Sequence, residues 1–112
     1  MSFLNSEDWH RVADSAAVGH EAAAEFVIAG KVVAVFRHQG KLYALDAMCA
    51  HQGGPIAKGT VEHGCVTCPW HGWQYELATG EQTIHQQKLL ETYPTEEADG
   101  GIWIKISSEG DT

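Results

Sequence analysis

Two short cysteine–histidine couples constrain this chain more than any other feature of its sequence. The first is Cys49-Ala50-His51 and the second is Cys68-Pro69-Trp70-His71, with residues 52–67 between them and glycine close behind each couple. Each couple offers one thiolate and one imidazole from a short loop. If the two loops face each other, four ligands converge, so the sequence predicts a metal or iron–sulfur cluster site.

The residues beside the couples suit such a site. A Cys-x-His couple does not easily wrap one small ion, but it can place a sulfur and a nitrogen on two neighbouring irons, so that each loop supplies one ligand to each iron. Backbone N–H groups must then approach the bridging sulfides closely, which a Cβ atom would prevent. Gly53, Gly54 and Gly72 meet that requirement.

The segments CAHQGG and CPWHGWQY resemble the two cluster-binding loops of Rieske proteins, in particular soluble Rieske ferredoxins and the Rieske domains of ring-hydroxylating oxygenases. The resemblance extends over nearly the whole chain. It implies one [2Fe-2S] cluster per chain, with Cys49 and Cys68 on the inner iron and His51 and His71 on the outer, solvent-nearer iron. It also implies a small cluster-binding subdomain at about 47–76, formed by the two loops.

Two other interpretations of the four residues are weighed against a cluster. A structural zinc site also uses cysteine and histidine, but it commonly has a cysteine pair followed by a histidine pair, whereas the order here is Cys-His and then Cys-His. Four unliganded residues would require two cysteines and two histidines to lie in glycine-rich loops by chance. The cluster is favoured over both.

Length and composition predict one domain over residues 1–112, with a basal β framework on either side of the subdomain. No apolar stretch approaches the roughly 18 residues of a membrane helix. Residues 1–10 lack the basic start and apolar run of a secretory signal, so a cytoplasmic protein without a membrane partner is expected. The net charge of -8, with 7 Lys and Arg, disfavours nucleic acid, because neutralising phosphates needs cations.

Strand and turn signals predict an all-β fold, an antiparallel sandwich or barrel. Residues 24–28 and 32–36 flank a turn at 29–31, and Gln39-Gly40 turns the chain into a strand at 41–45. Three antiparallel strands therefore lead into the first loop. The other expected elements are a short helical turn as one option within 15–24, a ribbon around His63-Gly64, a strand at 73–77, a turn at Thr79-Gly80, and closing strands near 89–93 and 102–106.

The third cysteine, Cys65, has no obvious partner. It is interpreted as a core residue of a short strand at 65–67, with a reactive thiol or a substitute ligand as the alternatives. The Rieske proteins of cytochrome bc complexes carry one more cysteine in each loop and join the two by a disulfide. Gly54 and Trp70 occupy the matching positions here, so that disulfide cannot form.

Several other side chains have a bland interpretation and a functional one. We expect Trp73 to exclude water from the site, and we leave Trp70 open between shielding and partner contact. The histidines outside the couples are expected at the surface: His10, His20, His38, His63 and His85. The acidic residues are expected to form a solvated face, with steering of a basic reductase as the alternative: Glu91, Glu96, Glu97 and Asp99.

Charge and missing motifs together predict an electron carrier that is not an enzyme by itself. Two neutral imidazoles bring an oxidised cluster to a charge of about zero, whereas four thiolates would leave about minus two, so an electron is accepted more easily. The chain has no Gly-x-Gly-x-x-Gly fingerprint and no room for a flavin domain or a mononuclear-iron site. We expect a flavin-dependent reductase as donor and a terminal oxygenase or other oxidoreductase as acceptor. The alternatives are a small subunit like that of a nitrite reductase and a zinc-binding structural module.

The second loop also predicts a low reduction potential. High-potential Rieske proteins resemble CPCHGSxY in this loop, where serine and tyrosine hydroxyls donate to cluster sulfurs and stabilise the reduced state. This chain has Trp73 at the serine position and keeps Tyr75 at the tyrosine position. Because one of the two donors and the disulfide are both absent, we expect a reduction potential toward the lower end of the Rieske span of roughly −150 to +300 mV.

Overall fold

A computed structural model describes residues 8–48, 54–70, 72–84 and 86–106. These ranges contain strands β1 to β12 and two single-turn 3-10 helices, η2 (Ser15–Ala17) and η3 (Ile56–Lys58). The predicted all-β class is confirmed, and η2 is the short helical turn expected within 15–24. In the described ranges no helix has both the length and the apolar character needed to cross a bilayer.

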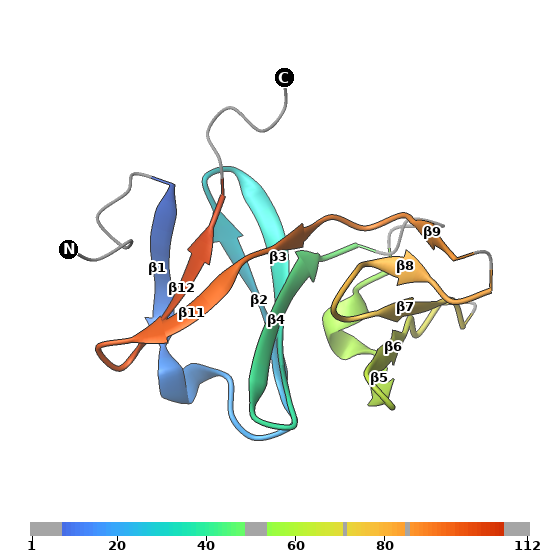
Figure 1. The fold of residues 1–112 in the computed structure, drawn as a ribbon, viewed down its shortest axis with the longest axis horizontal. Helices are drawn as coiled ribbons and strands as arrows, with labels where there is room; N and C mark the ends of the chain where they lie inside the picture. The colour runs from blue at the N-terminus through green and yellow to red at the C-terminus, as the bar shows by residue number, and fades with distance from the viewer. Residues whose placement is uncertain (1–7, 49–53, 71, 85, 107–112) are drawn as a thin grey trace.

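The four-stranded sheet is built from two tight hairpins (Figure 1). Its order is β10-β4-β3-β2, with the bounds Thr92–Tyr93, Lys41–Asp46, Lys31–His38 and Ala23–Ile28. Two-residue turns at Ala29-Gly30 and Gln39-Gly40 have positive φ at both positions, 52° and 83° in the first and 52° and 82° in the second. Such turns match the right-handed twist of the strands. Both predicted turns and all three strands before the first loop are confirmed, with Lys31 already in β3.

A three-stranded sheet packs beside it in the order β1-β12-β11, with the bounds Trp9–Asp14, Gly101–Lys105 and Thr95–Ala98. β12 matches the strand expected near 102–106. The sequence analysis does not predict β1 or β11. Glu96 and Glu97 are exposed on β11, at the edge of its sheet, and such charges weaken the strand signal while they protect an edge from pairing with other chains. The strand expected over 89–93 is correct only at β10, because residues 89–91 belong to the connection from β9.

The other lobe is a five-stranded sheet in the order β5-β6-β7-β8-β9 (Figure 1). The bounds are Thr60–Glu62, Cys65–Thr67, Gln74–Glu76, Glu81–Gln82 and Gln87–Lys88. The ribbon around His63-Gly64 is the β5–β6 hairpin, the strand expected at 73–77 is β7, and the turn at Thr79-Gly80 precedes β8. The sheet continues past residue 76 to Lys88. The subdomain limits of 47–76 and the single domain over 1–112 stay predictions.

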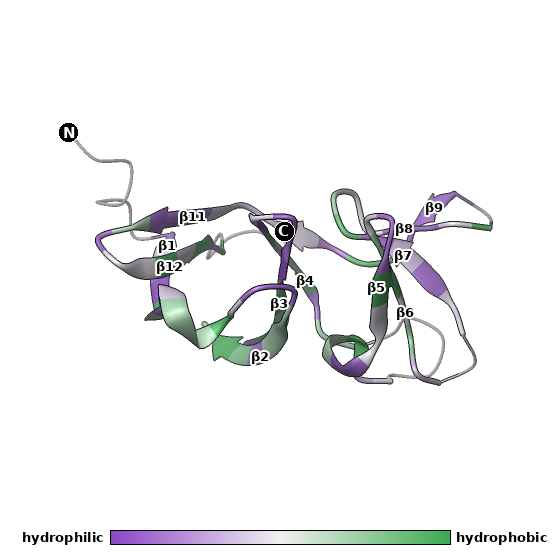
Figure 2. Cartoon of the chain, turned by 90° about the horizontal axis from the view of Figure 1, so that it is seen from below, coloured by the Kyte–Doolittle hydropathy of each residue, from purple (hydrophilic) through white to green (hydrophobic). Residues whose placement is uncertain are grey.

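Strand β3 lies between two hydrophobic cores. The core toward the three-stranded sheet includes Val33, Val35, Ile102 and Ile104. The core toward the five-stranded sheet includes Ala34, Phe36, Ile56, Val66, Cys68 and Tyr75. Because successive side chains of a strand point to opposite faces, one apolar run serves both cores. Figure 2 shows the same arrangement from below, with β3 and β4 between the two outer groups of strands.

Arg37, near the end of β3, holds the segment between β1 and β2. Its Nε donates to the carbonyl oxygen of Val18 at 2.7 Å, and its Nη2 donates to that of Ser15 at 3.2 Å. Nη1 and Nη2 also donate to the Glu97 carboxylate at 3.1 and 2.8 Å. Hydrogen bonding to Arg37 holds the pKa of Glu97 below its usual range. One guanidinium thus joins η2, β3 and β11.

The surface prediction is wrong for His38, which is only 9% exposed. His38 ends a strand that is buried on both faces. Its Nδ1 lies 2.8 Å from Oε1 of Glu21, so this ring nitrogen has a hydrogen-bond partner although the side chain is buried. Of the other histidines, His20 and His63 are exposed as expected, and His10 is half-buried in β1. His85 lies outside the described residues.

Replacement of Arg37 tests this junction. Arg37→Met should lower the free energy of unfolding by about 2–4 kcal/mol, because two part-buried carbonyl oxygens and a carboxylate lose their donors. Glu97→Gln is the matched control. It keeps the bonds to Val18 and Ser15 and should cost less than about 1 kcal/mol, since partly exposed ion pairs contribute little. Urea unfolding at neutral pH measures both variants, and equal losses would contradict this assignment.

The same comparison has a defined pH dependence. Hydrogen bonding to Arg37 lowers the pKa of Glu97 in the folded chain from its ordinary value of 4.5. Its contribution to stability is therefore complete above the unfolded pKa and is lost as pH falls through the lowered folded pKa. Below pH 4.5 the wild-type protein should lose stability more steeply than Glu97→Gln.

Candidate metal centre

Cys68 is the one predicted ligand among the described residues; Cys49, His51 and His71 lie outside them. Cys68 follows β6 directly and is 1% exposed. Its backbone N–H donates to the carbonyl oxygen of Trp73 at 2.7 Å, and the pairing of β6 with β7 begins at the next residues, Thr67 and Gln74. The second predicted loop is therefore closed at its base by a hairpin.

The first predicted loop is closed at its base as well, and it lies beside the second. Met48 and Pro55 form an antiparallel bridge across it. Beyond η3, a Cβ atom on Gly59 would overlap the carbonyl oxygen of Thr67, the last residue of β6. The contact is between two backbones, which have no flexible side chain to move aside. Glycine at this position thus keeps the bases of the two loops side by side.

The two loops meet at the sulfur of Cys68. A Cβ atom on Gly54 would lie 2.8 Å from Sγ of Cys68 and 2.9 Å from Cγ of Trp70. The backbone N–H of Trp70 donates to the same Sγ at 3.4 Å. A buried cysteine sulfur that accepts an N–H and lies beside a glycine backbone suits a metal–sulfur bond. The described part of the site therefore fits the donor set of an iron–sulfur cluster.

The aromatic side chains of this region are buried to different depths. Tyr75 on β7 is fully buried and belongs to the same hydrophobic core as Cys68. Trp73 is half-buried and packs against that core. Trp70 is 48% exposed. Cys68 therefore has buried apolar side chains on its core side, whereas Trp70 is open to solvent.

Cys65 corrects the sequence analysis in part. It lies in β6 as expected, but it is only half-buried, because the neighbouring Val66 takes the core-facing position of the short strand. Burial, and then the charge of Glu76 on the adjacent strand β7, raise the pKa of the Cys65 thiol. A thiol with a raised pKa is mostly protonated and reacts slowly. Neither Cys65 nor Cys68 forms a disulfide.

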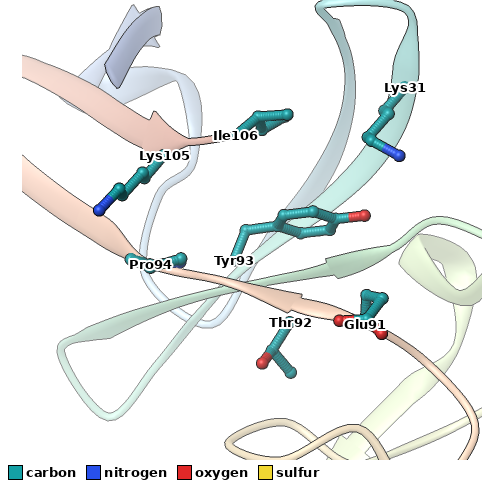
Figure 3. A pocket seen from close by; sticks show the side chains of 7 residues that line it. All are labelled: Lys31, Glu91, Thr92, Tyr93, Pro94, Lys105 and Ile106. Carbon is teal, nitrogen blue, oxygen red and sulfur yellow. The ribbon is translucent and has the colours of Figure 1, made fainter. Parts of the chain in front are cut away.

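The sequence analysis missed the pair of Asp46 and Tyr93, which fixes the end of β4 as the chain enters the first loop. The hydroxyl of Tyr93 donates to Oδ1 of Asp46 at 2.6 Å, and the N–H of Glu91 donates to Oδ2 at 3.0 Å. Burial and the bond to Asp46 raise the pKa of Tyr93, so the hydroxyl stays a donor. Figure 3 shows the Tyr93 ring in the wall of a hollow of about 400 Å³, with Lys31 and Lys105 on either side.

Comparison with known proteins places this geometry in a family. Residues 8–94 match the model of the Rieske [2Fe-2S] domain. The 3-phenylpropionate/cinnamic acid dioxygenase ferredoxin subunit of Photorhabdus laumondii is 34% identical over 79 residues, which cover 69% of this chain and 75% of that protein. Cholesterol 7-desaturase nvd of Xenopus laevis is 31% identical over 111 residues.

The chain spans only 24% of the length of that desaturase and 38% of a human Rieske domain-containing protein that also matches it. Among solved structures, the ferredoxin of carbazole 1,9a-dioxygenase from Nocardioides aromaticivorans has the same fold. It superposes with a TM-score of 0.82 at 20% identity, over 90% of this chain and 100% of that one. The chain belongs to the Rieske [2Fe-2S] domain family, whose members bind a [2Fe-2S] cluster.

Proposed function

We propose that Cys49, His51, Cys68 and His71 hold the [2Fe-2S] cluster and that the chain carries single electrons. The observation that carries this proposal is the meeting of the two predicted loops, where Gly54 of the first lies against Sγ of Cys68 in the second. A bound cluster supplies a one-electron couple. A zinc site is the weaker candidate, because the family match is to an iron–sulfur domain.

Each group of residues has a separate task in this proposal. The two cysteines would hold the inner iron, on the side of the core where Tyr75 and Trp73 pack. The two histidines would hold the outer iron, and their imidazoles would give the electron a route to the partner. Neutral imidazoles keep the charge of the oxidised site near zero.

The proposed donor is a flavin-dependent reductase, and the proposed acceptor is a terminal oxygenase or similar oxidoreductase. Similarity to a dioxygenase ferredoxin subunit supports this pair of partners. The chain also resembles one quarter of a desaturase, so we assign the chemistry on the substrate to the acceptor and not to this domain. A cytoplasmic location belongs to the same proposal.

Reconstitution tests the carrier role. Mixed with the reductase and the terminal oxygenase of a ring-hydroxylating system, the protein should take up one electron per chain and make product formation depend on its concentration. Cys49→Ser, expected to lack the cluster, is the control. Product formed by the chain and reductase without the oxygenase would contradict the carrier role. A large subunit that co-purifies stably would favour a nitrite reductase-like complex instead.

Ligand variants test the site. Cys49→Ser and His71→Ala should each lose most or all of the cluster, because each removes one iron bond. The matched control is Cys65→Ala, which should retain it, since Cys65 lies in β6 with its thiol largely protonated. Iron and sulfide content, visible absorption and the electron paramagnetic resonance of the reduced protein measure the outcome. Full cluster content in either ligand variant, or its loss in Cys65→Ala, would show that a ligand is misplaced.

The midpoint potential tests the role of the buried tyrosine. A hydroxyl that donates to a cluster sulfur stabilises the reduced state, so Tyr75→Phe should lower the potential. Tyr43→Phe is the matched control, because Tyr43 packs at the margin of the same core and the change keeps the ring that Lys41 covers. Protein-film voltammetry measures both. A wild-type midpoint above about +150 mV, in the upper half of the Rieske span, would contradict the low potential expected from the second loop.

A further inference from the structure

The indole ring of Trp70 rests on the backbone of the opposite loop. Its Cγ and Cδ2 atoms lie 2.9 and 3.0 Å from the position that a Cβ atom would take on Gly54. Gly54 belongs to the first loop and Trp70 to the second. A side chain of any size on Gly54 would push the ring away, so the contact depends on glycine at that position.

The same face of Gly54 also meets the sulfur of Cys68, with 2.8 Å between the Cβ position and Sγ. Trp70 is joined to this sulfur a second time by its backbone N–H, at 3.4 Å. Gly54, Cys68 and Trp70 therefore form a single contact, which we call the loop clasp. In the loop clasp, Trp70 contacts both the sulfur of Cys68 and Gly54 of the opposite loop.

The loop clasp lies beyond the points where the framework holds the loops. The Met48–Pro55 bridge closes the base of the first loop, and the β6–β7 pairing closes the base of the second. Glycine has no side chain with which to bury apolar surface, so the indole supplies the apolar area at this contact. About half of Trp70 is covered and 48% stays exposed.

We propose that Trp70 is a positioning residue: its indole holds the first cluster-binding loop, at Gly54, against the second and keeps water from the sulfur of Cys68. This inference rests on the proposed function, because it takes Cys68 as a cluster ligand. A smaller side chain at position 70 leaves Gly54 without its cover. The loops then separate more often, and water reaches the iron–sulfur bond.

Two measurable consequences follow from a smaller side chain at position 70. Iron leaves the folded protein faster, because loop opening precedes attack on the metal–sulfur bond. The midpoint potential rises, because nearby water stabilises the more negative reduced state better than an indole does. A purely structural role for Trp70 in the fold would change the unfolding transition and leave the potential in place.

The experiment compares holoproteins that carry Trp70→Phe, Trp70→Leu and Trp70→Ala. Iron release to an excess of chelator and the midpoint potential are measured for each, together with the thermal unfolding of the β framework. Gly54→Ala attacks the loop clasp from the other loop. Ile84→Ala is the matched control, since Ile84 is a large apolar residue that is 78% exposed between β8 and β9.

Iron release should be at least about tenfold faster in Trp70→Ala than in the wild type, which corresponds to about 1.4 kcal/mol. Trp70→Phe should stay near the wild type, Trp70→Leu should lie between, and Gly54→Ala should be faster with tryptophan still present. The potential should rise in the same order along the position-70 series. If Trp70→Ala does not retain iron through purification, the order of Phe and Leu decides.

Release rates and potentials that do not change with the size of residue 70 would overturn this inference. Equal acceleration in Ile84→Ala would do the same, because it would assign the effect to general loss of apolar surface. Failure of the proposed function is distinct from both outcomes. In that case the wild-type protein itself would hold no [2Fe-2S] cluster.

Discussion

The rest of the structure depends on the burial of β3 on both of its faces. One side of this strand packs against β12 through Val33 and Val35, and the other packs under the five-stranded sheet through Ala34 and Phe36. The two cores therefore both pack against β3, so a shift of this strand changes both. Because β4 pairs with β3 along its whole length and leads into the first loop, the position of that loop is set by the most buried part of the protein.

Local signals explain how much of the fold the sequence predicts. A glycine at the second turn position marks the turns at Ala29-Gly30, Gln39-Gly40 and His63-Gly64, and strands flank each of them. The sequence does not predict β1 and β11, because these strands are stabilised by pairing with β12, which is distant in sequence from β1. The burial of His38 is not predicted for a similar reason. A residue 17 positions away, Glu21, supplies the partner that permits its burial.

In the candidate site, too, local features are predicted from the sequence and contacts between distant residues are not. Ligand chemistry is local, so the spacing of the two couples predicts the ligand set, and the structure places Cys68 in a buried position against the first loop. The supports are not local. The pair of Asp46 and Tyr93 joins residues 47 apart in sequence, and no short motif announces a tyrosine hydroxyl that meets a carboxylate across two strands. Gly54, which the sequence analysis explains by room for a sulfide, also lies against the sulfur of Cys68 and the ring of Trp70.

Chemistry and stability make opposite demands on the two loops. Close approach to a cluster requires glycines, and electron transfer requires that one side of the loops faces solvent. Both requirements reduce the apolar area that normally orders a loop. The protein meets these demands with contacts that reach the loops from outside or across them. Gly59 rests on β6 at the base, the Asp46–Tyr93 pair holds the entry to the first loop, and Trp70 covers Gly54 beside the sulfur of Cys68. The closer such a contact lies to the sulfur, the more its loss should change the redox properties and the less it should change the fold.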